Sequence, residues 1–208
     1  MAEYFNYRLT EDAVLYFSNL FETSRYVSDK GGKPGDPRYN LKLLLSENSA
    51  DLEALVALTV DAHGGDIKGV KSPFKSAGTL IKEAVEKGKD AATIEKMRKT
   101  LAGKVQFSAH ATAARPPMLG CWVNGKATNL TTPDLVAAAK DKFYTGVLVR
   151  AEVSLKAYSE FDSGVTGYFN SVFSQGRGDR IGGQNDATAF AGLVPPSRGH
   201  VSGSNADF

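Results

Sequence analysis

The stretch FYTGVLVRAEVSLKAYSEFDSGVTGYFNSVFS, residues 143–174, decides the fold. From Val147 to Tyr158, small or branched apolar side chains alternate with polar or larger ones. A period of two over this length is typical of a strand with one buried and one solvated face. A turn follows, and Val165 to Ser174 forms a second extended arm. The stretch therefore predicts a long β-hairpin.

The two faces of the first arm differ in chemistry. The predicted inner face contains only Val, Ala and Leu side chains: Val147, Val149, Ala151, Val153, Leu155 and Ala157. The other face carries the cations Arg150 and Lys156 and the ring of Tyr158. The inner face accounts for folding, so any function of this hairpin must lie on the outer face.

Further strands flank this hairpin on the N-terminal side. Extended pieces are expected at 4–9, 13–21, 38–46 and 104–111. Two more, 118–123 and 126–130, flank Asn124-Gly125, which is a strong signal for a two-residue hairpin turn.

The period changes to helical spacing between residues 49 and 102, where Asn48 or Ser49 and then Asp90 are expected N-caps. Pro133 begins a short helix that should run to about Lys140. Several strands with one helix near Pro133 suit a mainly β protein with inserted helices, an α+β chain built on an OB-fold-like five-stranded barrel.

The chain divides into two regions by composition. Residues 1–175 should form the barrel domain, with a helical insertion around 49–102. Residues 176–208 are rich in Gly, Ser and Asn and poor in apolar side chains, so they are expected to form a flexible tail.

Composition limits the classes of function. The chain has 208 residues, a net charge of +2 and a single cysteine, Cys121, which excludes an internal disulfide and suits a reducing, cytoplasmic setting. No apolar run approaches the roughly 20 residues that a membrane helix needs. The three histidines, His63, His110 and His200, lack metal-ligand spacing, and no catalytic cluster is recognisable. We therefore expect a protein that is not an enzyme and uses no metal or cofactor.

The outward strand positions combine cations with aromatic rings. Such a surface suits single-stranded nucleic acid, because cations follow the phosphates and rings stack on bases without reading sequence. Tyr and Phe also favour strands whatever the function, so no single ring is decisive. The predicted DNA-binding residues are Arg38, Tyr39, Lys42, Trp122, Lys126, Arg150, Lys156, Tyr158 and Tyr168.

Four segments resemble a family of phage-encoded single-stranded DNA-binding proteins that was first catalogued as a domain of unknown function. They are Asn19-Leu20-Phe21-Glu22, Pro37-Arg38-Tyr39 leading into Leu43-Leu44-Leu45, Phe143-Tyr144-Thr145-Gly146, and Tyr168-Phe169-Asn170-Ser171-Val172 before Gly182-Gly183. The resemblance covers about half of the chain. It implies an OB-fold that binds single strands without sequence specificity during phage DNA replication, recombination or repair, in the cytoplasm of a bacterial host.

The resemblance also gives the tail a role. Tails in this family commonly end in an acidic, aromatic tip that binds replication proteins, and Asp207-Phe208 matches such a tip. Arg177, Arg180 and Arg198 depart from the acidic pattern. Two alternatives remain: a virion structural or assembly protein, and a recombination factor that anneals single strands.

Overall fold

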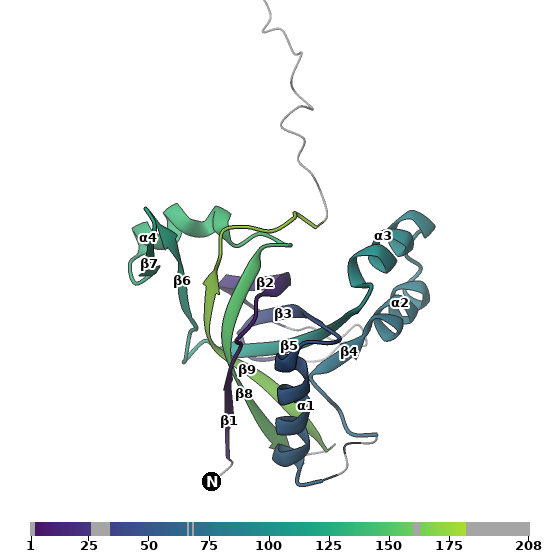
Figure 1. The fold of residues 1–208 in the computed structure, drawn as a ribbon. Coiled ribbons are helices and arrows are strands. Elements are labelled where there is room, and N and C mark those ends of the chain that lie inside the picture. The colour runs from purple at the N-terminus through teal and green to yellow at the C-terminus, as the bar shows by residue number, and fades with distance from the viewer. Residues whose placement is uncertain (1–2, 26–33, 66, 68, 160–162, 182–208) are drawn as a thin grey trace, which may run out of the picture.

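The computed structural model describes residues 3–25, 34–65, 67, 69–159 and 163–181. Within them the chain is mainly β, with four α-helices and a single sheet of nine strands (Figure 1). The strands are β1 (Phe5–Arg8), β2 (Ala13–Ser24), β3 (Arg38–Ser46), β4 (Phe74–Ser76), β5 (Lys104–Thr112), β6 (Met118–Val123), β7 (Lys126–Asn129), β8 (Leu148–Tyr158) and β9 (Gly164–Ser174).

Five of the strands pair in a closed ring. β8 pairs with β2, β2 with β3, β3 with β5, β5 with β9, and β9 returns to β8. β1 extends the sheet along β8, β6 and β7 extend it beyond β9, and β4 adds to β5. The ring has five strands, and the sheet adds β4 to the eight extended segments that the sequence predicted.

The predicted hairpin of residues 143–174 is confirmed. β8 and β9 pair antiparallel from Val149 opposite Ser174 to Tyr158 opposite Gly164. Val147, Val149, Val153 and Leu155 are completely buried and belong to the main core inside the ring. The inner face of the first arm is thus buried in the core, as its alternation predicted.

The ring closes through a short parallel contact between β5 and β9. Only Ala109 opposite Gly167 and His110 opposite Tyr168 are paired there. A Cβ at Gly167 would lie 2.6 Å from the Ser108 carbonyl oxygen and 3.0 Å from the Phe107 ring. Closure therefore requires a residue without a side chain at position 167.

Helix α1 (Ala50–His63) begins at Ser49, whose hydroxyl accepts a hydrogen bond from the Leu52 amide. Its first turn is fixed by the buried carboxylate of Asp51, which accepts from the Tyr7 hydroxyl and from the Thr10 and Glu11 amides. These bonds hold the pKa of Asp51 below its ordinary value, although burial alone would raise it. Asp51 therefore ties α1 to β1 and to the connection between β1 and β2.

The other helices also match their predicted positions. α2 (Ala77–Glu86) and α3 (Ala91–Leu101) form a helical hairpin that stands beside β4 and β5, with Asp90 as the α3 N-cap (Figure 1). α4 (Pro133–Ala139) lies between β5 and β8 in the chain and has the predicted Pro at its start. The segment 49–102, predicted as a helical insertion, also contains the short strand β4.

Two loop predictions have different outcomes. Asn124 and Gly125 both have positive φ, 49° and 75°, and join β6 to β7 as predicted. The start of the predicted tail is held against the ring, since the Leu148 amide donates to the Arg177 carbonyl and the Tyr144 hydroxyl donates to the Gly178 carbonyl. Residues 182–208, including Asp207 and Phe208, lie outside the described residues. In the part that is described, no helix is long and apolar enough to cross a membrane.

Replacing Gly167 with alanine should destabilise the protein by about 1–3 kcal/mol, because backbone and ring atoms must move apart at the ring closure. Gly78→Ala is the matched control. Gly78 lies in α2, and the nearest atom to an added Cβ is the Ser76 hydroxyl at 3.8 Å, so the change should be neutral or slightly stabilising. Denaturant unfolding measures both variants, and an unchanged midpoint for Gly167→Ala would contradict this account of closure.

Candidate nucleic-acid interface

A row of polar and aromatic side chains crosses the outer face of the sheet. Each residue of the row lies directly opposite the next one on the neighbouring strand, in the order β2, β3, β5, β9, β8 and β1, although these strands are widely separated in sequence. We call this set the polar row: Asn19, Asn40, His110, Tyr168, Ser154 and Asn6. It gives a continuous surface across six strands, with a depression on each side of His110.

The larger depression, which we call the basic groove, has a volume of about 900 Å³ and lies over β2, β3, β5 and β9. Two aromatic side chains, Phe17 and Tyr158, line it, and Asp36 is the only carboxylate among its described lining residues. Its cationic lining residues are Arg25, Arg38, Lys42, Lys71 and Lys75. This excess of cations and the two rings suit a flexible polyanion that carries aromatic bases.

Lys42 lies at the centre of these charges. Its ammonium nitrogen is 5.4 Å from the centroid of the half-exposed Phe17 ring, opposite it in the β2–β3 ladder. Burial, followed by the positive charges of Lys75 and Lys87, lowers the pKa of Lys42, while Glu83 partly opposes this effect. The charged form of Lys42 is therefore less favoured than that of an ordinary lysine, and an anion beside it would oppose this shift.

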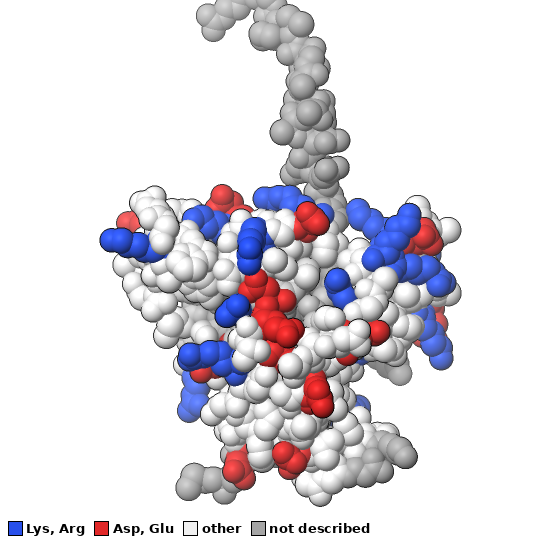
Figure 2. Space-filling model, viewed as in Figure 1, with Lys and Arg blue, Asp and Glu red and all other residues white. Residues whose placement is uncertain are grey.

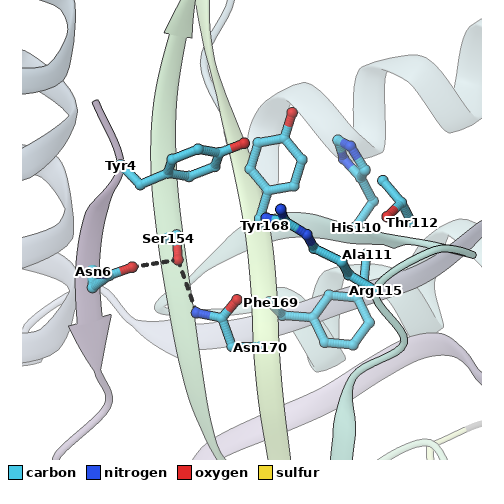
Figure 3. A pocket seen from close by; sticks show the side chains of 10 residues that line it. All are labelled: Tyr4, Asn6, His110, Ala111, Thr112, Arg115, Ser154, Tyr168, Phe169 and Asn170. Atoms are coloured by element: carbon cyan, nitrogen blue, oxygen red, sulfur yellow. Dashed lines mark hydrogen bonds between the residues drawn. The ribbon is translucent and has the colours of Figure 1, made fainter. Parts of the chain in front are cut away.

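The smaller depression, which we call the aromatic pocket, has a volume of about 520 Å³ and lies over β1, β8, β9 and β5 (Figure 3). The Tyr168 ring is 4.5 Å from the His110 ring and 5.6 Å from the Tyr4 ring, between centroids. The Lys156 ammonium is 5.2 Å from the Tyr4 ring centroid. Because His110 lines both depressions, the basic groove and the aromatic pocket are neighbours.

The structure brings together five of the nine residues predicted to bind DNA. Arg38, Lys42 and Tyr158 line the basic groove, Tyr168 lines the aromatic pocket, and Lys156 lies beside that pocket on Tyr4.

The other four predicted residues lie elsewhere. Tyr39 is half-buried and packs against the main core, so its position does not suit base stacking. Arg150 is paired with Asp12 at 3.1 Å. Trp122 on β6 donates to the Gln175 side chain and packs edge-on against Phe173, and Lys126 is exposed on β7. Neither Trp122 nor Lys126 lines either depression.

Several residues of the interface were not predicted from the sequence. His110 showed no metal-ligand spacing in the sequence, and only its pairing with Tyr168 across β5 and β9 reveals its place in the interface. Phe17 was missed because a register shift between Leu15 and Phe17 interrupts the alternation of β2 and turns this ring outward. Arg115 follows β5 in a turn and has no periodic pattern that would mark it.

The α2–α3 hairpin adds further cations. Figure 2 shows Lys and Arg side chains gathered over this hairpin, while acidic side chains lie nearer the middle of the same face. The exposed cations of the two helices and their connection include Lys82, Lys87, Lys89, Lys96, Arg98 and Lys99, of which Lys82 and Lys99 have i,i+4 glutamate partners. The effect of this hairpin on Lys42 is mixed, because Lys87 lowers the pKa of Lys42 while Glu83 in α2, which pairs with Lys75 at 2.6 Å, raises it.

Comparison with solved structures shows a shared fold. The chain is similar to a single-stranded DNA-binding protein from bacteriophage Enc34, both in complex with ssDNA (TM-score 0.56, 14% identity, 85% of this chain and 89% of that chain) and alone (TM-score 0.56, 13% identity, 89% of both chains). A C-terminal truncation of that protein gives a TM-score of 0.54 at 13% identity, over 84% of this chain and 88% of the other. No protein-family model and no curated protein matches the chain significantly. Among the described residues, no group of three or more His, Cys, Asp or Glu side chains is arranged to hold a metal ion.

His110 should make stability depend on pH. Burial, and then the positive charge of Arg38, lowers the pKa of His110 from 6.5 to about 4. The unfolded chain therefore binds more protons between these values, and stability is lost as pH falls through that range. The loss should be about 1–2 kcal/mol, allowing for the partial exposure of the ring.

The variant His110→Gln should remove this contribution. Denaturant unfolding of both proteins at pH 4.5 and pH 7 measures it, and other titrating groups cancel in the difference. The variant should lose less stability on acidification than the parent protein. An equal loss in the two proteins would show that His110 titrates normally.

Proposed function

We propose that this protein binds single-stranded DNA without strong sequence specificity, through the basic groove and the adjoining aromatic pocket. The observation that carries the proposal is the polar row, which joins a groove whose described lining has five cations and one carboxylate to a group of packed aromatic rings. The shared fold with a phage protein whose structure contains ssDNA supports it. Cations would hold phosphates, and exposed rings would stack on bases at about 1–3 kcal/mol each.

The topology supports the finer part of the proposal, that the five-strand ring is an OB-fold barrel. OB-folds are five-stranded Greek-key barrels that bind oligonucleotides, and α4 lies between the third and fourth strands of the ring, as the position of Pro133 predicted. We also propose that the protein acts in phage DNA replication, recombination or repair, and that the tip Asp207-Phe208 contacts replication proteins. The resemblance of the four sequence segments supports these roles.

Salt dependence tests the proposed function. Affinity for a fluorescent oligonucleotide should fall with salt, with a log–log slope of about −0.7 for each phosphate neutralised. The double variant Arg38→Gln/Lys42→Gln should weaken binding and make the slope shallower by about 0.7 for each phosphate that is no longer neutralised. Anisotropy titrations at several salt concentrations measure both quantities.

Lys126→Gln is the matched comparison, because Lys126 was predicted from the sequence but lies outside the groove. It should leave the slope unchanged. A larger effect from Lys126 than from the Arg38 and Lys42 pair would move the DNA path to β6 and β7. Absence of single-strand binding at low salt would overturn the proposed function.

A further inference from the structure

The floor of the aromatic pocket is a hydrogen-bonded chain of three side chains. The Asn170 amide nitrogen donates to the Ser154 hydroxyl at 2.9 Å, and that hydroxyl donates to the Asn6 carbonyl oxygen at 2.7 Å (Figure 3). Ser154 is buried, whereas both asparagines are exposed and line the pocket. In the described part of the chain, the remaining polar atom of each amide forms no hydrogen bond.

The hydrogen-bonded side chains present one donor group and one acceptor to the pocket. In the arrangement observed, Asn6 keeps its NH₂ group and Asn170 keeps its carbonyl oxygen. The nitrogen and oxygen of a side-chain amide can be assigned either way round, and the pocket still receives one donor group and one acceptor after such an exchange. Ser154 has one hydroxyl hydrogen, so it donates to one amide and accepts from the other, and the two free atoms are of opposite kind in either direction.

The rest of the pocket suits a flat aromatic ligand attached to an anionic chain. Tyr168 and Tyr4 provide the aromatic side of the pocket. Arg115 extends toward Tyr168 (Figure 3), and Lys156 lies over Tyr4, so cations stand beside the rings. No carboxylate is among the described residues that line the pocket. Through His110 the pocket continues into the basic groove, which supplies a path for the neighbouring phosphates.

We propose that the aromatic pocket binds one unpaired nucleobase of the bound strand, with the ring stacked on Tyr168 and its Watson–Crick edge hydrogen-bonded to Asn6 and Asn170. This inference rests on the proposed function and adds a base-reading site to it. Every nucleobase has a donor and an acceptor side by side on that edge, in an order that differs between bases, and unpaired bases can be read there by hydrogen bonds. The pocket therefore accepts any unpaired base, ranks the bases, and excludes a base whose edge is used in a duplex.

A chemically blocked edge tests the proposal. Thymidine methylated at N3 keeps its ring for stacking but loses its edge donor. The parent protein should bind an N3-methylthymidine oligonucleotide about tenfold more weakly than oligo(dT) of the same length, the size of one good edge contact. The double variant Asn6→Ala/Asn170→Ala should bind both oligonucleotides alike, within about twofold, and keep the salt slope of the parent protein.

Asn19→Ala is the control, because Asn19 belongs to the polar row but lines only the basic groove. It should retain the parent's discrimination. Thermal unfolding checks that the variants fold. If oligo(dT) binds and salt weakens it, but methylation has no effect or affects the parent and the double variant equally, the base pocket is overturned while the proposed function stands. If oligo(dT) does not bind at low salt, both proposals fail.

Discussion

The ring of strands depends on the contact between β5 and β9. Two residue pairs of a parallel ladder close it, and one of these pairs leaves no room for a side chain at Gly167. The other pair sets His110 beside Tyr168 on the outer face. The constraint that completes the fold therefore also brings together the two rings at the centre of the interface. A wider separation of these strands would break both the core boundary and the continuity between the basic groove and the aromatic pocket.

β8 determines how far the outer face extends. Its N-terminal part pairs with β2 and completes the ring, while its middle pairs with β1, from Phe5 opposite Leu155 to Arg8 opposite Glu152. Where β8 pairs with β1, its pairing with β9 has a register shift, between Glu152 and Val153. β1 thereby carries Tyr4 and Asn6 to the pocket, and Asp51 holds the end of β1 through Tyr7 and Thr10. The pocket is thus built on strands fixed from two sides, which favours a defined geometry for a ligand.

Local patterns in the sequence predicted the elements well. The alternation of 147–158, the caps Ser49 and Asp90, Pro133 and the Asn124-Gly125 turn all specify structure within a few residues, and the structure contains each of them. The site was predicted less completely, because its residues meet through register between distant strands. Asn6, Ser154 and Tyr168 become neighbours only when β1, β8 and β9 are aligned. Arg150 shows the same limit, since periodicity marks it as an outward cation but does not reveal its partner Asp12, which comes from the other end of the chain at 3.1 Å. An outward cation is therefore a poor guide to a binding site until its neighbours are known.

Lys42 shows the opposite case. Burial is the main cause that lowers its pKa, and the cations Lys75 and Lys87 add to this effect, while Glu83 opposes it. Although the net charge is only +2, five cations and one carboxylate are among the described residues that line the basic groove. Like charges at close range repel each other in the free protein, and a polyanion in the groove would offset that repulsion. The local arrangement of charge, and not its total, is therefore what separates this surface from the rest of the molecule.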